Sequence, residues 1–267
     1  MKKILLSLFF VMAFFTLPSY AEILVFVHGY DSHSNTWRNK GIFSFLHNQG
    51  WQDAGNLISH PNGILYQQAN ELKPYRMVTV DLPSEAPIQV QAVLLAAYVE
   101  TLRKQDPKQL FTLIGHSAGG VVSRYTVVRY PELPIKRLIT IASPHLGTGM
   151  AEAVELVAKS PVSIMAPILD ADIINHSGIL LDQLQREEPG SFLFWLNRKK
   201  HPEINYFSII RSSGSLFDKD HYVPSYSQDL KFIPGIRFAQ SFPSRGKHQL
   251  QYRDAFLIAR LVNKPVK

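Results

Sequence analysis

The stretch Gly115-His116-Ser117-Ala118-Gly119-Gly120 decides the fold that this sequence predicts. It follows an apolar run at residues 110–114 and precedes residues 121–128, whose pattern is typical of a helix. A strand, a Gly-x-Ser-x-Gly turn and a helix present a serine on a strained bend, and the glycines let strand and helix approach closely. This context marks Ser117 as a candidate nucleophile. A motif that arose by chance in a loop would lack it.

Apolar runs of strand length alternate with helix-like segments through most of the chain. Besides residues 110–114, the predicted strands are 22–27, 76–81, 136–142, 205–211 and 236–239, and helical spacing is found at 36–47, 88–104 and 250–262. Strands that alternate with helices predict a mostly parallel sheet with right-handed crossovers, covered by helices on both faces, which is an α/β fold. Residues 51–74 are predicted to be a loop, with turn signals at Pro61-Asn62-Gly63 and Lys73-Pro74.

The alternation stops after Ser143-Pro144-His145-Leu146-Gly147. Residues 149–200 carry helical apolar patterns and no obvious strand. A helical insertion between two strands of a parallel sheet predicts a cap over the strand ends, where open α/β sheets bind their ligands. Ordinary cover of the sheet is the alternative for each of these helices.

The serine needs two partners. A hydroxyl becomes a nucleophile when an imidazole takes its proton and a carboxylate orients that imidazole. On this fold the groups follow in the order serine, acid, histidine, with the acid and the histidine in loops after strands. Asp220 and His248 satisfy both conditions after Ser117. Asp218 stays open as the acid. Asp220 is preferred because Asp-x-x-Val-Pro brings it near a proline that stiffens the chain, and Asp229 is a more distant choice.

Ten histidines compete for the role of base, and their positions select His248. The others precede the serine (His28, His33, His47 and His60), lie in its turn (His116), lie in the insertion (His176 and His201) or follow strands too early (His145 and His221). His248 follows the last predicted strand, and a solvated loop histidine is its alternative role.

Attack on an ester carbonyl creates an oxyanion, which needs preorganised hydrogen-bond donors. The amide of Ala118, directly after the nucleophile, is the first expected donor, and the loop after the opening strand is expected to supply the second. His28-Gly29-Tyr30 stands at the end of that strand, and we select the N–H of Tyr30. A plain strand-ending turn is the alternative. His28 is expected to order the loop through hydrogen bonds rather than take part in chemistry.

Together these residues resemble the α/β-hydrolase-fold serine lipases and esterases, specifically the bacterial triacylglycerol lipases and the related inositol deacylases. The resemblance spans residues 23–262 and rests on five motifs: Phe26-Val27-His28-Gly29-Tyr30 with Trp37 downstream, the Ser117 turn, Ile141-Ala142-Ser143-Pro144-His145-Leu146-Gly147-Thr148, Asp220-x-x-Val-Pro, and His248. It implies that residues 143–147 border the nucleophile and lead into a lid. The chain starts directly at the His-Gly strand, so the two extra edge strands of larger members are not expected. A compact sheet of about six strands is therefore expected. No clear calcium-site signature is visible.

Residues 1–21 are typical of a cleaved export signal, with Lys2 and Lys3 before an apolar centre and Ser19-Tyr20-Ala21 at the end. The alternative is an uncleaved anchor, but the apolar centre is shorter than the ~20 residues that a membrane span needs. Cleavage removes 21 of 267 residues, and the 246 that remain, 22–267, are enough for one α/β domain. The absence of cysteine excludes disulfides and a lipid-modified cysteine.

Charge is a weak guide to the partners. Without Lys2 and Lys3, 26 of the 28 basic residues remain against 21 acidic ones. This mild excess favours anionic lipid surfaces and is too small to indicate nucleic acid.

These features predict an exported serine hydrolase, periplasmic or secreted, that cleaves carboxylic esters through Ser117, His248 and Asp220 by way of an acyl-enzyme. The insertion is rich in leucine, isoleucine, methionine and phenylalanine, which indicates a lipid or other apolar acyl ester and contact of the cap with a lipid surface. Core-packing helices have the same composition. Acyl transfer by the same triad and a noncatalytic binding protein on a hydrolase fold remain open, and amide or thioester cleavage is less favoured. No cofactor or metal is expected, and the sequence does not specify the oligomeric state.

Overall fold

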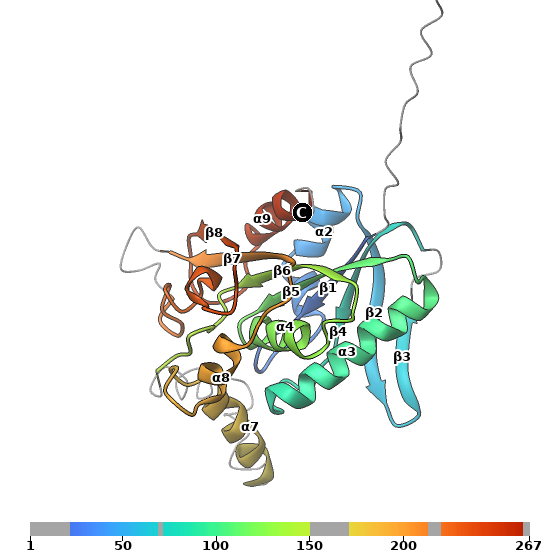
Figure 1. Cartoon of the computed structure of the whole chain (residues 1–267). Helices are drawn as coiled ribbons and strands as arrows, with labels where there is room; N and C mark the ends of the chain where they lie inside the picture. Colours follow the sequence, from blue (N-terminus) through green and yellow to red (C-terminus); the bar gives the residue numbers. More distant parts are fainter. Residues whose placement is uncertain (1–21, 69–71, 150–170, 213–219, 264–267) are drawn as a thin grey trace, which may run out of the picture.

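One twisted sheet forms the centre of the protein (Figure 1). The computed structural model describes residues 22–68, 72–149, 171–212 and 220–263. Within these ranges the strands are β1 (Glu22–Val27), β2 (Gln52–His60), β3 (Gly63–Gln68), β4 (Tyr75–Val80), β5 (Leu110–His116), β6 (Ile135–Ile141), β7 (Asn205–Arg211) and β8 (Ala239–Ser244). Their order is β3-β2-β4-β1-β5-β6-β7-β8, and every neighbouring pair is parallel except β2 and β3.

Helices cover both faces of the sheet, as Figure 1 shows. The long α3 (Ile88–Gln105) and α4 (Ala118–Arg129) pack on one face, and α1 (Thr36–Asn39), α2 (Ile42–His47) and α9 (Asp254–Val262) pack on the other. Successive side chains of a strand point to opposite faces, and those of β1 enter two separate cores: Val25 packs with α3 and α4, while Phe26 packs with α2 and α9. This arrangement confirms the predicted α/β fold class.

The predicted loop at residues 51–74 is wrong, because β2 and β3 form an antiparallel hairpin there. The hairpin turns at Pro61-Asn62, with His60 opposite Gly63, and β2 adds to the sheet beside β4. Eight strands therefore replace the six expected. Both strands carry many polar and exposed residues. An edge hairpin buries little apolar surface, so the hydrophobic pattern that revealed the other strands is weak here.

Smaller differences also lie at the periphery. The last strand runs from Ala239 to Ser244 rather than over residues 236–239, and it includes Pro243, which an edge strand tolerates. The predicted helix at 36–47 is divided into α1 and α2 at Gly41, whose φ is 73°. The final helix starts at Asp254 rather than at residue 250.

Two helices lie in the described part of the predicted cap, α7 (Ala171–Gln183) and α8 (Phe192–Arg198). Ser177 of α7 accepts a hydrogen bond from the Tyr30 hydroxyl at 3.4 Å, and the Thr148 amide donates to Leu184 at 2.9 Å. These contacts join α7 to the loops that follow β1 and β6, at the carboxyl edge of the sheet. Residues 150–170 and the export signal at 1–21 lie outside the described residues, so the cap boundaries and the signal stay predictions. No helix in the described ranges is both long and apolar enough to cross a membrane.

Candidate active site

Ser117 lies on the bend between β5 and α4, at the carboxyl edge of the sheet. Its backbone has φ 52° and ψ −128°, a strained conformation for a residue with a side chain. The Ser117 amide donates to the Ile141 carbonyl at 2.9 Å, which ties the bend to the end of β6. Gly119 lets the helix pass the end of β1, because a Cβ atom there would lie 2.1 Å from the His28 carbonyl oxygen. The motif thus forms the strand, turn and helix that the sequence predicts.

Two loops from the carboxyl-terminal part of the chain bring an imidazole and a carboxylate to Ser117. His248 Nε2 lies 2.8 Å from Ser117 Oγ, and His248 Nδ1 lies 2.9 Å from Asp220 Oδ2. The three residues are between 3% and 5% exposed. Because a carboxylate accepts hydrogen bonds, the proton of a neutral His248 lies on Nδ1, and the lone pair of Nε2 faces the serine hydroxyl. This arrangement is able to take the serine proton.

Hydrogen bonds within its own loop hold Asp220 in place. Asp220 Oδ1 accepts from the amides of Tyr222 and Val223, both at 3.0 Å. Asp220 Oδ2 accepts from Gln228 Nε2 at 3.0 Å, in addition to His248. A carboxylate held from four directions has little freedom to rotate, so it also fixes the plane of the imidazole.

The other candidates of the sequence have different places. Asp218 lies outside the described residues. Asp229 caps the 3-10 helix η2 (Leu230–Phe232) by accepting from the Lys231 amide at 2.9 Å. His145 is buried against Thr140, and His221 is exposed. In the part of the chain that the structure describes, no three histidine, cysteine, aspartate or glutamate side chains are grouped to hold a metal ion.

The loop after β1 lies directly against Ser117. A Cβ atom at Gly29 would lie 2.9 Å from Ser117 Cβ and 3.1 Å from the His116 carbonyl oxygen, so only glycine fits without movement. His28 orders this loop as expected: its Nδ1–H donates to the Gly29 carbonyl at 3.0 Å, and its Nε2 accepts from the Leu82 amide at 3.0 Å.

Two backbone amides flank this contact. Tyr30 directly follows Gly29, and Ala118 directly follows Ser117 as the first residue of α4. The first N–H groups of an α-helix have no partner within the helix. Among the described residues, no hydrogen bond is found for the N–H of Tyr30 or of Ala118. Both amides are therefore available to an acceptor in this region.

Three side chains that the sequence reasoning missed hold the loops of Asp220 and His248. His116 Nε2 donates to the His248 carbonyl at 2.9 Å. Arg211 Nη2 donates to the Gln249 carbonyl at 3.0 Å, and the Arg211 amide donates to Gln228 Oε1 at 2.7 Å. The position of His116 in the Ser117 turn is a sequence signal for its role. Arg211 and Gln228 have none, because their contacts join residues far apart in the chain.

Four buried histidines make the fold sensitive to acid. Burial lowers the pKa of His28, lowers those of His116 and His145 well below 6.5, and lowers that of His201 to about 4. These imidazoles stay neutral in the folded protein, whereas the unfolded chain binds protons below about pH 6.5. The stability that depends on them is therefore present above pH 6.5 and is lost as the pH falls toward the folded pKa values. Each histidine contributes up to about 1.4 kcal/mol per pH unit in that window.

We therefore expect the free energy of unfolding in urea to fall from pH 7.5 to pH 5.5, with a slope that His116→Gln reduces. His47→Ala is the matched control, because His47 is exposed at the end of α2 and its removal should leave the slope unchanged. A free energy of unfolding that is constant over this range would contradict the neutral, buried state of the four rings.

The sheet topology, the strained Ser117 and its flanking loops define an α/β-hydrolase of the lipase and esterase class. A family model described as palmitoyl protein thioesterase matches residues 24–236, which is more than half of the 267 residues. The chain belongs to the palmitoyl protein thioesterase family.

Individual relatives agree with this class. A triacylglycerol lipase of Pseudarthrobacter phenanthrenivorans is 33% identical over 87 residues, which are 33% of this chain and 27% of the lipase. The match thus spans little more than a quarter of that relative's length. The crystal structure of the lin2722 gene product of Listeria innocua has a TM-score of 0.62 and 14% identity, and the match covers 91% of this chain and 94% of that one. The crystal structure of the Bacillus licheniformis lipase BlEst2 in propeptide form has a TM-score of 0.61 and 17% identity. That match covers 92% of this chain and 51% of the BlEst2 chain. The two structures share the fold.

Proposed function

We propose that this protein is a serine hydrolase that cleaves carboxylic esters through Ser117, His248 and Asp220. The observation that carries the proposal is the continuous contact from the Ser117 hydroxyl through both nitrogens of His248 to the Asp220 carboxylate, at 2.8 and 2.9 Å. A serine that served only as a structural hydrogen-bond donor would not need the strained backbone of Ser117. A nucleophile does, because the strain presents its hydroxyl to the imidazole.

The proposed reaction has two halves. Ser117 Oγ attacks the ester carbonyl carbon while His248 Nε2 takes the hydroxyl proton. Asp220 stabilises the resulting imidazolium, which then protonates the leaving alcohol as the bond from the carbonyl carbon to that alcohol breaks. In the second half, His248 removes a proton from water, and the hydroxide displaces Ser117 from the acyl group. The carboxylic acid leaves, and the serine recovers its proton.

The amides of Tyr30 and Ala118 are the proposed oxyanion hole. Gly29 packs on Ser117, and Tyr30 is the residue that follows Gly29, so the Tyr30 amide is close to the nucleophile. Ala118 follows the nucleophile in the chain. A donor aimed at the developing charge contributes about 10²–10³ in rate.

Replacement of Gly29 by alanine is expected to lower kcat by about 10²-fold, with a small effect on KM. The new Cβ meets Ser117 Cβ and the His116 carbonyl, so the loop that carries the Tyr30 amide must move. Steady-state kinetics on p-nitrophenyl butyrate measure the change. Gly178→Ala is the control, since a Cβ there meets nothing within 4 Å. Equal kcat in Gly29→Ala and the native protein would exclude this loop as an oxyanion donor.

The proposed substrates are lipids or other apolar acyl esters. The match to a triacylglycerol lipase supports this class, and so do the exposed apolar side chains of the cap: Ile179 of α7 is 52% exposed and Trp195 of α8 is 43% exposed. Such side chains offer an apolar surface to an acyl chain or to a lipid interface. The mild basic excess agrees with an anionic interface.

Thioester cleavage is the second candidate reaction, and the family match favours it. The name of the matching family refers to a palmitoyl protein thioesterase. The same serine would attack a thioester carbonyl, and the same amides would stabilise the oxyanion that forms. Acyl transfer to an alcohol other than water would use the same acyl-enzyme, and only an acceptor that competes with water distinguishes it.

A substrate series tests the proposal. We expect turnover of p-nitrophenyl esters that rises from acetate toward long acyl chains, and covalent labelling of Ser117 by a fluorophosphonate probe. Palmitoyl-CoA with detection of the released thiol gives the thioester arm. A preference for short chains would remove the lipid assignment. Folded protein that neither turns over an ester or thioester nor reacts with the probe would favour a noncatalytic binding protein.

We also propose that the protein is exported and that residues 1–21 are removed. The basic start and apolar centre of this segment support the proposal. Mass spectrometry of the protein recovered from a bacterial host should give a chain that begins at Glu22. An intact amino terminus in the cytosolic fraction would contradict it.

A further inference from the structure

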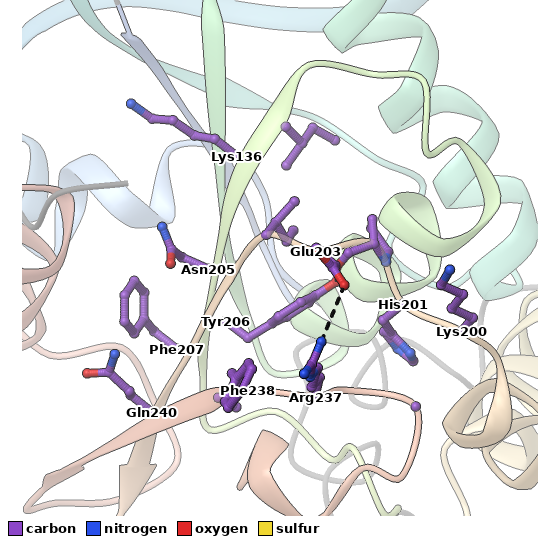
Figure 2. A pocket seen from close by; sticks show the side chains of 15 residues that line it. Lys136, Lys200, His201, Glu203, Asn205, Tyr206, Phe207, Arg237, Phe238 and Gln240 are labelled. Atoms are coloured by element: carbon purple, nitrogen blue, oxygen red, sulfur yellow. Dashed lines mark hydrogen bonds and ion pairs between the residues drawn. The ribbon is translucent and has the colours of Figure 1, made fainter. Parts of the chain in front are cut away.

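A cavity lies at the edge of the sheet opposite to Ser117. It has a volume of about 550 Å³ and is formed by the amino ends of β6, β7 and β8 together with the segments that precede β7 and β8 (Figure 2). Ser117 follows the carboxyl end of the parallel strand β5, so this cavity is separate from the candidate active site. Its volume lies within the range of about 300–1,000 Å³ that is typical of small-molecule sites.

Part of the cavity wall is apolar and aromatic. Ile135, Tyr206 and Phe207 come from the strands. Phe238 comes from the segment before β8 and is 66% exposed, the largest exposure of any large apolar side chain in the described ranges. An aromatic ring left this open beside a cavity offers a surface for an apolar chain.

Two exposed cations lie beside this apolar surface. Lys200 and Arg237 are exposed beside the cavity, from the segments before β7 and β8, whereas the charge of Lys136 at the start of β6 is compensated by Glu22 at 2.9 Å. Glu203 is the single carboxylate of the lining, and its contact with Arg237, at 4.0 Å between residues with side chains 81% and 78% exposed, is a weak one that solvent screens. The local charge therefore favours an anion.

A fully buried cation acts electrostatically on two residues that line the cavity. Arg124 of α4 is 0% exposed, and none of its three guanidinium nitrogens has a hydrogen-bond partner among the described residues. Burial is the main cause of the low pKa of His201, and the positive charge of Arg124 is the second cause. The same charge opposes the rise that burial causes in the pKa of Tyr206. Both of these residues line the cavity, so the field of Arg124 reaches it.

We propose that this cavity binds an amphiphile with an anionic head group, a carboxylate or a phosphate, on an apolar chain. The head group lies near Lys200 and Arg237, while the chain packs on Phe238 and the strand residues. The site is independent of the proposed ester hydrolysis, and its occupation requires no turnover.

Isothermal titration calorimetry on the full-length folded protein tests this site. The probes are decanoate, decyl phosphate, inorganic phosphate and neutral decyl glucoside. We expect both anionic amphiphiles to bind, the glucoside to bind at least tenfold more weakly, and binding of the anions to weaken as salt rises from 0.05 to 0.5 M. A preference for decanoate over decyl phosphate assigns the head group to a free fatty acid, and the reverse preference assigns it to a phosphorylated lipid.

Variants locate the binding event. Lys200→Glu/Arg237→Glu should weaken both anionic amphiphiles about tenfold, because two attractions become repulsions. Phe238→Ala should weaken the amphiphiles and leave the response to inorganic phosphate unchanged. The charge-matched control is Lys40→Glu/Arg260→Glu, which changes two exposed cations on α9 and beside α1.

The outcome decides the proposal in either direction. All substituted residues are exposed, so folding should be retained, and far-ultraviolet circular dichroism checks it. Weakening in the cavity variants but not in the control supports the site. The proposal is overturned if neither anionic amphiphile binds, if the glucoside binds as tightly as the anions, or if the cavity and control variants behave alike. Calorimetry measures binding at this site and ester turnover measures the proposed function, so a failure of one proposal is distinguished from a failure of the other.

Discussion

Replacement of Ser117 by alanine is expected to lower kcat for ester hydrolysis by about 10⁴- to 10⁶-fold. The reason is geometric: Ser117 Oγ is the atom that His248 Nε2 contacts at 2.8 Å, and the alanine side chain offers no group for acyl transfer. Turnover of a p-nitrophenyl ester by purified protein measures the loss. The residual rate comes from substrate binding and the oxyanion hole, and KM should change little because the hydroxyl acts mainly in the transition state.

Ser123→Ala is the matched control for this experiment. Ser123 lies in the same helix, and its hydroxyl donates to the Gly119 carbonyl at 2.7 Å, four residues earlier. Its removal should leave kcat close to that of the native protein. Native turnover in Ser117→Ala, confirmed on a preparation free of host esterases, would exclude the proposed mechanism. Loss of fluorophosphonate labelling in Ser117→Ala but not in Ser123→Ala gives a second readout.

Replacement of Asp254 by asparagine is expected to lower the free energy of unfolding by about 3–5 kcal/mol. Asp254 and Arg211 form two hydrogen bonds of 2.6 and 2.7 Å, and both side chains are 0% exposed. Asparagine keeps the shape but removes the charge, so the guanidinium stays buried without its counter-ion. Because Arg211 also holds the Gln249 carbonyl beside His248, ester turnover should fall as well. Urea unfolding at pH 7.5 measures the change in stability.

A similar pair that is only partly buried provides the control. Arg38 and Asp53 make two hydrogen bonds of 2.7 Å, but their side chains are 25% and 39% exposed. Solvent screens a partly exposed pair more than a fully buried one, so Asp53→Asn should cost about 1 kcal/mol, well below the loss for Asp254→Asn. Equal losses in Asp53→Asn and Asp254→Asn would contradict the view that burial determines the contribution of the Arg211–Asp254 pair.

The proposed site could be predicted from sequence to the extent that its signals are local. Ser117 is surrounded by its strand, its glycines and its helix, all within about twenty residues of one another. Asp220 and His248 were selected by chain order and by their positions in loops after strands, and these signals left Asp218 open. Contacts of Asp220 with Tyr222, Val223 and Gln228 were not accessible, since a loop conformation depends on the surface against which the loop packs.

By itself the sequence determined the central sheet and the bend that carries Ser117, because long apolar runs must be buried and because a Gly-x-Ser-x-Gly bend follows from backbone sterics. Only the tertiary structure decided the hairpin of β2 and β3 and the course of β8, which carry many polar residues and are held by hydrogen bonds to neighbouring strands. It also decided which distant side chains meet: His248 with Ser117, and Arg211 with Asp254. Such pairs leave no periodic trace in the chain, since their energy arises from burial and contact after the sheet has formed.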